Sequence, residues 1–148
     1  MDYVDENARE LGRLRELVDR LTDEDLHAPV YEDWTAAGIL AHIAFWDARA
    51  LVLGRKLERG APFSPSDAEP EDVDWINDAA RLLIEAIEPR RAAALAVRLA
   101  TEVDDLMASL PPERMWPQDP DSPVNPLRAD HRSEHLDQLE AAFGLAAR

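Results

Sequence analysis

The sequence predicts an all-α protein, a four-helix bundle with a long crossover before its last helix. Apolar residues recur along the chain at a spacing near 3.6, and no segment shows a sustained period of two. No sheet beyond an incidental hairpin is therefore expected. Four main helical segments follow one another, each long enough to pack along the others. Six prolines between Pro111 and Pro126 predict the irregular crossover.

The first predicted element is an amphipathic helix of about 15–20 residues, because apolar residues repeat at helical spacing. These residues are Val4, Leu11, Leu14, Val18 and Leu21. Thr22 and Asp25 then stand three residues apart, which is the spacing of a capping box. The pair predicts a short helical turn that ends at Pro29.

The second helix is expected to begin after Thr35 as N-cap and to run to about Arg59, before Gly60. A helix of this size is about 36 Å long. Gly38 lies one turn before His42, where glycine costs about 1 kcal/mol relative to alanine. It either leaves room beside His42 or allows two helices to pack closely, and the sequence does not choose between these.

Residues 61–70 contain three prolines and are expected to form a loop. An apolar pattern over residues 73–87 predicts a third helix, and a further pattern extends over residues 95–110. Pro89 either bends one helix here or opens a second, since proline is tolerated in a first turn. The last helix is expected to start near Leu127.

Three histidines are the most informative side chains. His131 and His135 are one turn apart, so both lie on one helix face, in the apolar seam that Leu127 and Leu139 continue. His42 lies in the second helix among apolar residues. Three imidazoles can hold one transition metal and leave coordination positions free. The alternative is a set of core histidines that hydrogen bonds satisfy, because such a pair also arises by chance.

Other residues restrict which atoms could bind this metal. The chain has no cysteine, so a metal would be held by nitrogen and oxygen. Glu134 is about 100° from His135 around the helix, so it is expected at the surface or behind the ligands. His27 has no partner at a matching position and is expected to be exposed.

The formal net charge of −15 disfavours nucleic acid and anionic membranes as partners. The N-terminal segment has no secretory signal, and no apolar run is expected to reach the roughly 20 residues that span a bilayer. A length of 148 residues fits one domain, residues 1–148. We therefore expect a cytoplasmic protein that binds a small molecule. Apolar surface on the first helix and around Trp116 predicts a homodimer.

Three segments resemble the DinB-like superfamily of four-helix bundles. Residues 33–35 (DWT) with 39–47 (ILAHIAFWD) resemble its second-helix signature. Asn77 within DWIN is similar to an asparagine that opens the third helix in many members. Residues 131–135 (HRSEH) resemble its C-terminal metal pair. The superfamily includes the N-terminal domain of mycothiol-dependent maleylpyruvate isomerase and the bacillithiol transferases, and the resemblance covers essentially the whole chain.

The resemblance implies a divalent ion, often zinc or nickel, held by His42, His131 and His135. Characterised relatives use this ion to activate a low-molecular-weight thiol such as mycothiol. We therefore expect a metal-dependent small-molecule transferase or hydrolase, with or without such a thiol. The isomerases carry a further C-terminal domain, which makes their specific reaction a poor match. The alternative is a non-catalytic or self-resistance protein that binds a small molecule, with the metal structural or absent.

Four further residues are candidates for the lining of the ligand pocket. Trp46 and Arg49 lie one and two turns beyond His42, and Arg81 lies one turn beyond Asn77. A dication beside a bound thiol favours the thiolate, so an anionic ligand can bind locally to an acidic protein. The simpler interpretation is that the tryptophan belongs to the core and the arginines to a solvated face.

Overall fold

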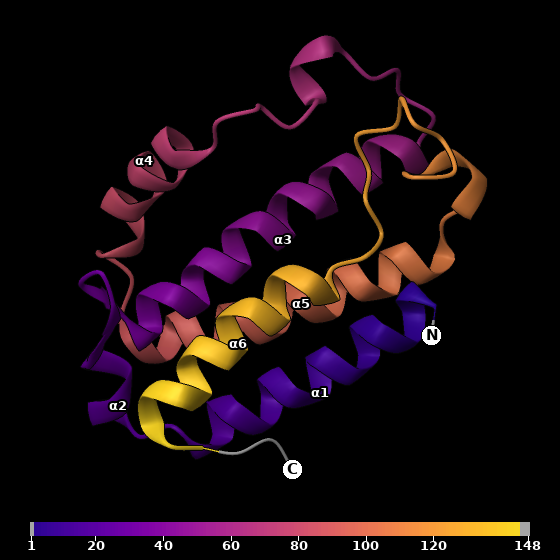
Figure 1. Cartoon of the computed structure of the whole chain (residues 1–148). Coiled ribbons are helices and arrows are strands. Elements are labelled where there is room, and N and C mark those ends of the chain that lie inside the picture. Colours follow the sequence, from indigo (N-terminus) through magenta and orange to yellow (C-terminus); the bar gives the residue numbers. More distant parts are fainter. Residues whose placement is uncertain (1, 146–148) are drawn as a thin grey trace.

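Four long helices form the body of the molecule in the computed structural model, which describes residues 2–145. They are α1 (Tyr3–Arg20), α3 (Ala36–Glu58), α5 (Pro89–Ser109) and α6 (Ala129–Phe143). Helix α5 packs against α3 and α1, and α1 also packs against α6 (Figure 1). This arrangement confirms the predicted all-α bundle and its long crossover between α5 and α6.

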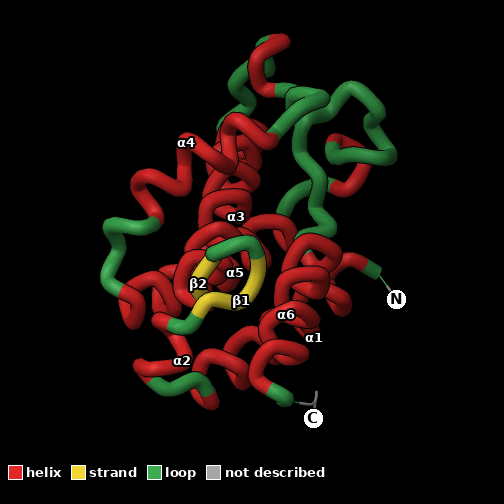
Figure 2. Tube along the Cα trace, turned by 60° about the vertical axis from the view of Figure 1, so that its left-hand side comes forward, coloured by secondary structure: helices red, strands yellow, loops and turns green. Residues whose placement is uncertain are grey.

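Smaller elements join these helices (Figure 2). Helix α2 (Asp23–His27) leads into a two-stranded antiparallel hairpin, β1 (Pro29–Tyr31) and β2 (Trp34–Thr35). Helix α4 (Asp74–Ile84) packs against α3. Short 3-10 turns, η1 (Pro65–Asp67) and η2 (Pro112–Arg114), lie within the two proline-rich connections. The crossover thus contains one regular turn that was not expected.

Capping residues set most of the predicted helix ends. Thr22 and Asp25 form the expected capping box at α2, and the Thr35 side chain accepts from the backbone of Gly38 at the start of α3. At Pro89 the structure has two helices, because α4 ends at Ile84 and Pro89 occupies the first turn of α5. The Glu88 carboxylate caps α5 by accepting two backbone N–H groups.

Helix α3 packs mainly against α5, and most of its apolar residues are buried in a core that residues of α1, α5 and α6 share. It is also long and apolar enough to cross a membrane by length and composition, which the sequence analysis did not recognise. Of the apolar window in this helix, 67% is buried within the bundle. Such burial is typical of the core helix of a water-soluble protein, in which neighbouring helices cover the apolar surface.

Candidate metal centre

The three predicted histidines meet in space, although they come from two helices. His42 is on α3, and His131 and His135 are one turn apart on α6. The Nε2 atom of His131 lies 3.2 Å from Nε2 of His42 and 3.2 Å from Nε2 of His135. Each histidine offers one nitrogen that could bind a metal, and these three nitrogens all lie within 4.8 Å of one another. The sequence spacing therefore identified a real cluster of side chains.

The spacing of these nitrogens fits a shared metal ion. Two nitrogens that are each about 2.1 Å from one ion, at an angle of about 100°, lie about 3.2 Å apart. The structure has this separation for both pairs that include His131. All three ligand atoms are Nε2, and imidazole nitrogen suits zinc, nickel and related ions.

Hydrogen bonding alone does not satisfy the cluster. The side chain of Gln138 offers its Oε1 to Nδ1 of His135 at 2.9 Å, so Nδ1 donates and Nε2 of a neutral His135 carries a lone pair. His131 can then donate one proton from Nε2, which leaves its buried Nδ1 without a partner among the described residues. If Nδ1 keeps the proton instead, a buried donor is unpaired. A metal at the Nε2 atoms would bind the lone pairs that face one another there, and Nδ1 of His131 would then carry the proton.

The electrostatics of the cluster keep two of the imidazoles neutral. Burial, followed by repulsion from His135, lowers the pKa of His42 to about 4. Burial, followed by His135 and His42, lowers the pKa of His131 to about 3. Neutral imidazole is the form that binds metals, so protons compete weakly for these two ligands near neutral pH.

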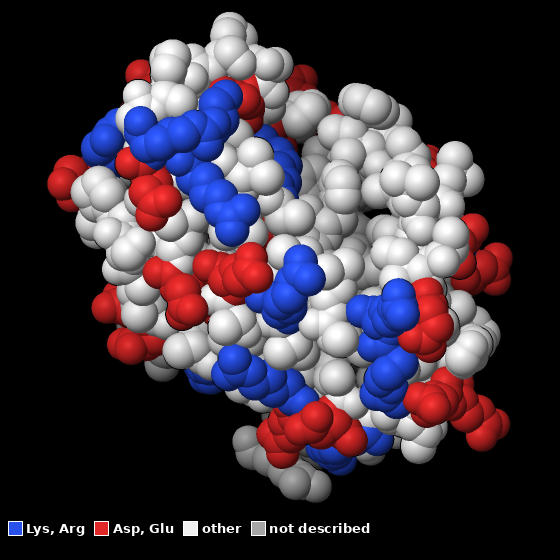
Figure 3. Space-filling view, turned by 180° about the vertical axis from the view of Figure 1, so that it is seen from behind, with Lys and Arg blue, Asp and Glu red and all other residues white. Residues whose placement is uncertain are grey.

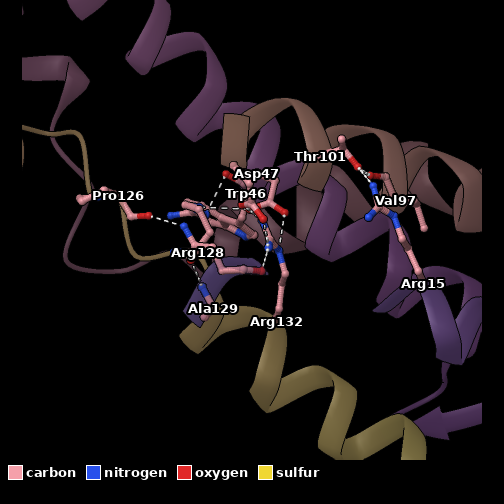
Figure 4. A network of polar contacts seen from close by, with 11 residues as sticks. Arg15, Trp46, Asp47, Val97, Thr101, Pro126, Arg128, Ala129 and Arg132 are labelled. Carbon is pink, nitrogen blue, oxygen red and sulfur yellow. Dashed lines mark hydrogen bonds and ion pairs between the residues drawn. The ribbon is translucent and has the colours of Figure 1, made fainter. Parts of the chain in front are cut away.

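A buried ion-pair network holds α6 in place next to the histidines (Figure 4). Arg132, which is 0% exposed, donates Nη1 and Nη2 to Asp104 of α5 at 2.8 and 2.6 Å and Nε to Asp47 of α3 at 3.2 Å. The second oxygen of Asp47 accepts from Nε of Arg128 at 3.1 Å. Because Arg132 directly follows His131, this network fixes the helix that carries two of the three imidazoles.

Asn7 of α1 supplies the cap that α6 lacks in its own sequence. Its Oδ1 accepts from the backbone N–H groups of Arg128 and Ala129 at 2.8 and 2.9 Å, and its Nδ2 donates to the carbonyl of Pro126 at 2.8 Å. Asn7 is buried. The first turn of α6, just before His131, is thus positioned by a residue more than a hundred positions earlier in the chain.

Two cavities share the histidine cluster as a wall. The larger, about 650 Å³, is bordered by α4, α6 and the hairpin and includes Trp34, Asn77 and all three histidines. The smaller, about 270 Å³, includes His42 and His131 together with Trp46, Arg49 and Arg128. A ligand in either cavity can therefore reach the imidazoles. The larger volume fits a drug-sized small molecule.

The structure brings three of the four predicted pocket residues to this site. Nε1 of Trp46 donates to Oδ1 of Asn77 at 2.8 Å, and both residues line the smaller cavity with Arg49. Arg81 lies elsewhere: its guanidinium stacks 4.6 Å from the Trp34 ring centre, donates to Glu85, and lines a separate cavity. His27 is exposed, as expected.

Trp34 is a site residue that the sequence analysis passed over. Its ring meets that of His42 edge to face, with centroids 5.7 Å apart. A Cβ at Gly38 would lie 3.3 Å from this ring and 3.2 Å from Oγ1 of Thr35. Gly38 therefore makes room for Trp34, which in turn packs on a candidate ligand. The DWT motif could have predicted this position, because it places the tryptophan directly before Thr35, the N-cap of α3.

Comparison with known proteins gives one match. A family model described as the DinB superfamily matches residues 6–139, which include all three histidines of the cluster. Among curated proteins and solved structures, none matches the chain significantly.

Proposed function

Because this chain belongs to the DinB superfamily, we propose that it is a metal-dependent enzyme that transfers or hydrolyses a group on a small molecule. His42, His131 and His135 would hold one divalent transition metal, with zinc and nickel as the leading candidates. The observation that carries this proposal is the convergence of three Nε2 atoms, one from each histidine, in a cavity wall.

A bound divalent ion of this type supplies a Lewis acid that favours the thiolate of a bound thiol or the hydroxide of bound water. Three neutral imidazoles would leave the charge of the ion unneutralised by its own ligands. The chain has no cysteine, and no serine lines either cavity that shares the histidines. The nucleophile would therefore come from outside the chain, as a low-molecular-weight thiol such as mycothiol or as water.

The remaining residues of the site would bind and orient the substrate. Gln138 accepts from Nδ1 of His135, which holds the ring with Nε2 toward the cluster. Asn77 is fixed by Trp46, so its amide has a defined position between the two cavities. Trp34 packs edge to face on His42, and α4 borders the larger cavity. These contacts set the orientation of a small substrate without taking part in bond formation.

We also propose that the protein acts in the cytoplasm, on small molecules and not on nucleic acid. On the face seen in Figure 3, lysine and arginine side chains lie next to acidic ones and form no continuous basic surface. A homodimer remains our expectation. Exposed apolar side chains on α4, Trp75, Leu82 and Leu83, are additional candidates for its interface.

The test is elemental analysis of protein purified without a polyhistidine tag, followed by turnover assays. We expect close to one equivalent of transition metal per chain and metal-dependent reaction of a thiol with an electrophile, or metal-dependent hydrolysis. Bound metal without turnover on either class would instead support a binding module. Protein without metal, even after incubation with zinc and nickel salts, would refute the proposal.

A further inference from the structure

The larger cavity has a strongly acidic lining. Four carboxylates border it, from Glu32, Asp74, Asp78 and Glu134, and no lysine or arginine does. Among residues 2–145, none of these four carboxylates has an ion-pair partner within 4.0 Å or accepts a hydrogen bond. Their charges are therefore directed to solvent and to whatever occupies the cavity.

These acidic residues come from three separate elements around the histidines. Glu32 is in the hairpin turn, where its φ of 43° is left-handed, Asp74 and Asp78 are one turn apart on α4, and Glu134 is on α6. Asp74 lies in the first turn of α4, where the helix dipole favours a negative charge. The fold thus gathers four acidic residues from three elements at this cavity.

The smaller cavity, which shares His42 and His131, has a mixed lining. Arg49 and Arg128 line it together with two acids, Glu69 and Asp130. Arg128 is paired with Asp47, whereas the printed hydrogen bond of Arg49 goes to the backbone carbonyl of Asp67 at 2.8 Å. The larger cavity is therefore the one of these two whose charged lining, histidines aside, is entirely acidic, and its potential favours a cation.

We propose that the larger cavity binds a cationic small molecule, a protonated primary or secondary amine. Its ammonium group would lie among the four carboxylates, and its other end would reach the histidines. The aromatic ring of Tyr31, which also lines the cavity, suits an ammonium group because ring faces attract cations. This inference names the substrate class of the proposed function. It depends on that function only for the contact between the ligand and the metal.

The test uses three imidazoles that differ in the charge of a short tail: N-aminopropylimidazole, N-propylimidazole and N-carboxyethylimidazole. Each offers one ring nitrogen to the metal, and the tail is too remote from that nitrogen to chelate. Calorimetric titration of the zinc-loaded protein at low ionic strength should show the cation binding about tenfold more tightly than the neutral compound. The anion should bind most weakly.

The double variant Asp78→Asn with Glu134→Gln keeps the side-chain shapes and removes two charges. It should reduce the preference for the cation to about threefold or less, while the affinity for N-propylimidazole stays unchanged. Asp105→Asn is the matched control, because Asp105 is exposed on α5 and does not line the cavity. It should keep the full preference.

Equal binding of the three compounds, or tighter binding of the anion, would overturn the inference. So would a second equivalent of zinc that the double variant loses, since the carboxylates would then be metal ligands.

If none of the imidazoles binds, the proposed metal function fails, and this failure is separate from the inference about charge. Charge preference is then measured on metal-free protein with benzylammonium and benzoate by ligand-detected NMR. A benzylammonium signal that the double variant loses supports the inference, and its absence refutes it.

Discussion

Replacing Asp47 with asparagine tests whether the buried ion-pair network holds the bundle together beside the histidines. Asp47 is 1% exposed and accepts from Arg128 and Arg132 through separate oxygens. Asparagine has nearly the same shape but keeps only one of these acceptors. Its amide nitrogen would face a guanidinium donor, and the network of two arginines and two aspartates would gain a net positive charge.

The cost can be estimated from the burial of the partners. Breaking a buried ion pair by removing one charge typically costs about 3–5 kcal/mol, because the remaining charge is left unpaired. Arg132 is fully buried, although Asp104 still binds it through two hydrogen bonds. We therefore expect Asp47→Asn to lower the free energy of unfolding by about 3 kcal/mol, at the lower end of that range.

Urea denaturation of the metal-free protein measures this change. The midpoint should fall while the slope of the transition stays constant, since the native surface area is unchanged. Asp137→Asn is the control. Asp137 is a surface carboxylate, 71% exposed, that pairs with Arg13, and the loss of such a pair costs about 1 kcal/mol or less. If the two variants are equally stable, the argument for a stabilising buried network is wrong.

Two further predictions concern α6 and the pH response. Asn7→Ala should cost about 1–2 kcal/mol in urea denaturation, because the N–H groups of Arg128 and Ala129 lose their acceptor, and an unchanged midpoint would contradict the cap. The metal-free protein should lose stability as pH falls from 6.5 towards 4 and below, because the pKa of His42 and His131 is lower in the folded than in the unfolded state. Thermal melts of the wild type and of His42→Gln should show a weaker pH dependence in the variant over this range.

Local signals allowed the sequence to predict the helices and the histidine cluster. Thr35 marks a helix start by chemistry that acts within one turn, so no tertiary information was needed. At Pro89 the sequence left a bend and a helix start open, and the structure has a helix start. The spacing of His131 and His135 placed both rings on one face, and the apolar neighbours of His42 indicated a buried site. Their convergence required only that the two helices face each other in the bundle.

Long-range partners explain what the sequence did not reveal. Arg132 lies between two histidines in a charged segment, where a surface position is the usual interpretation of an arginine. Its burial depends on Asp47 and Asp104, which are 85 and 28 positions away in the sequence. The role of Asn7 depends in the same way on a contact with residues 128 and 129. Such pairings exist only once the helices have packed.

The most direct test of the metal centre is the metal content of untagged wild-type protein beside His42→Ala, His135→Ala and His27→Ala. We expect close to one transition metal per chain in the wild type and in His27→Ala, and a sharp loss in the other two. Added zinc at a hundredfold excess over its dissociation constant should stabilise the wild type by about 2.7 kcal/mol. Full metal content and unchanged melting in both His42→Ala and His135→Ala would show that the three imidazoles are only core residues.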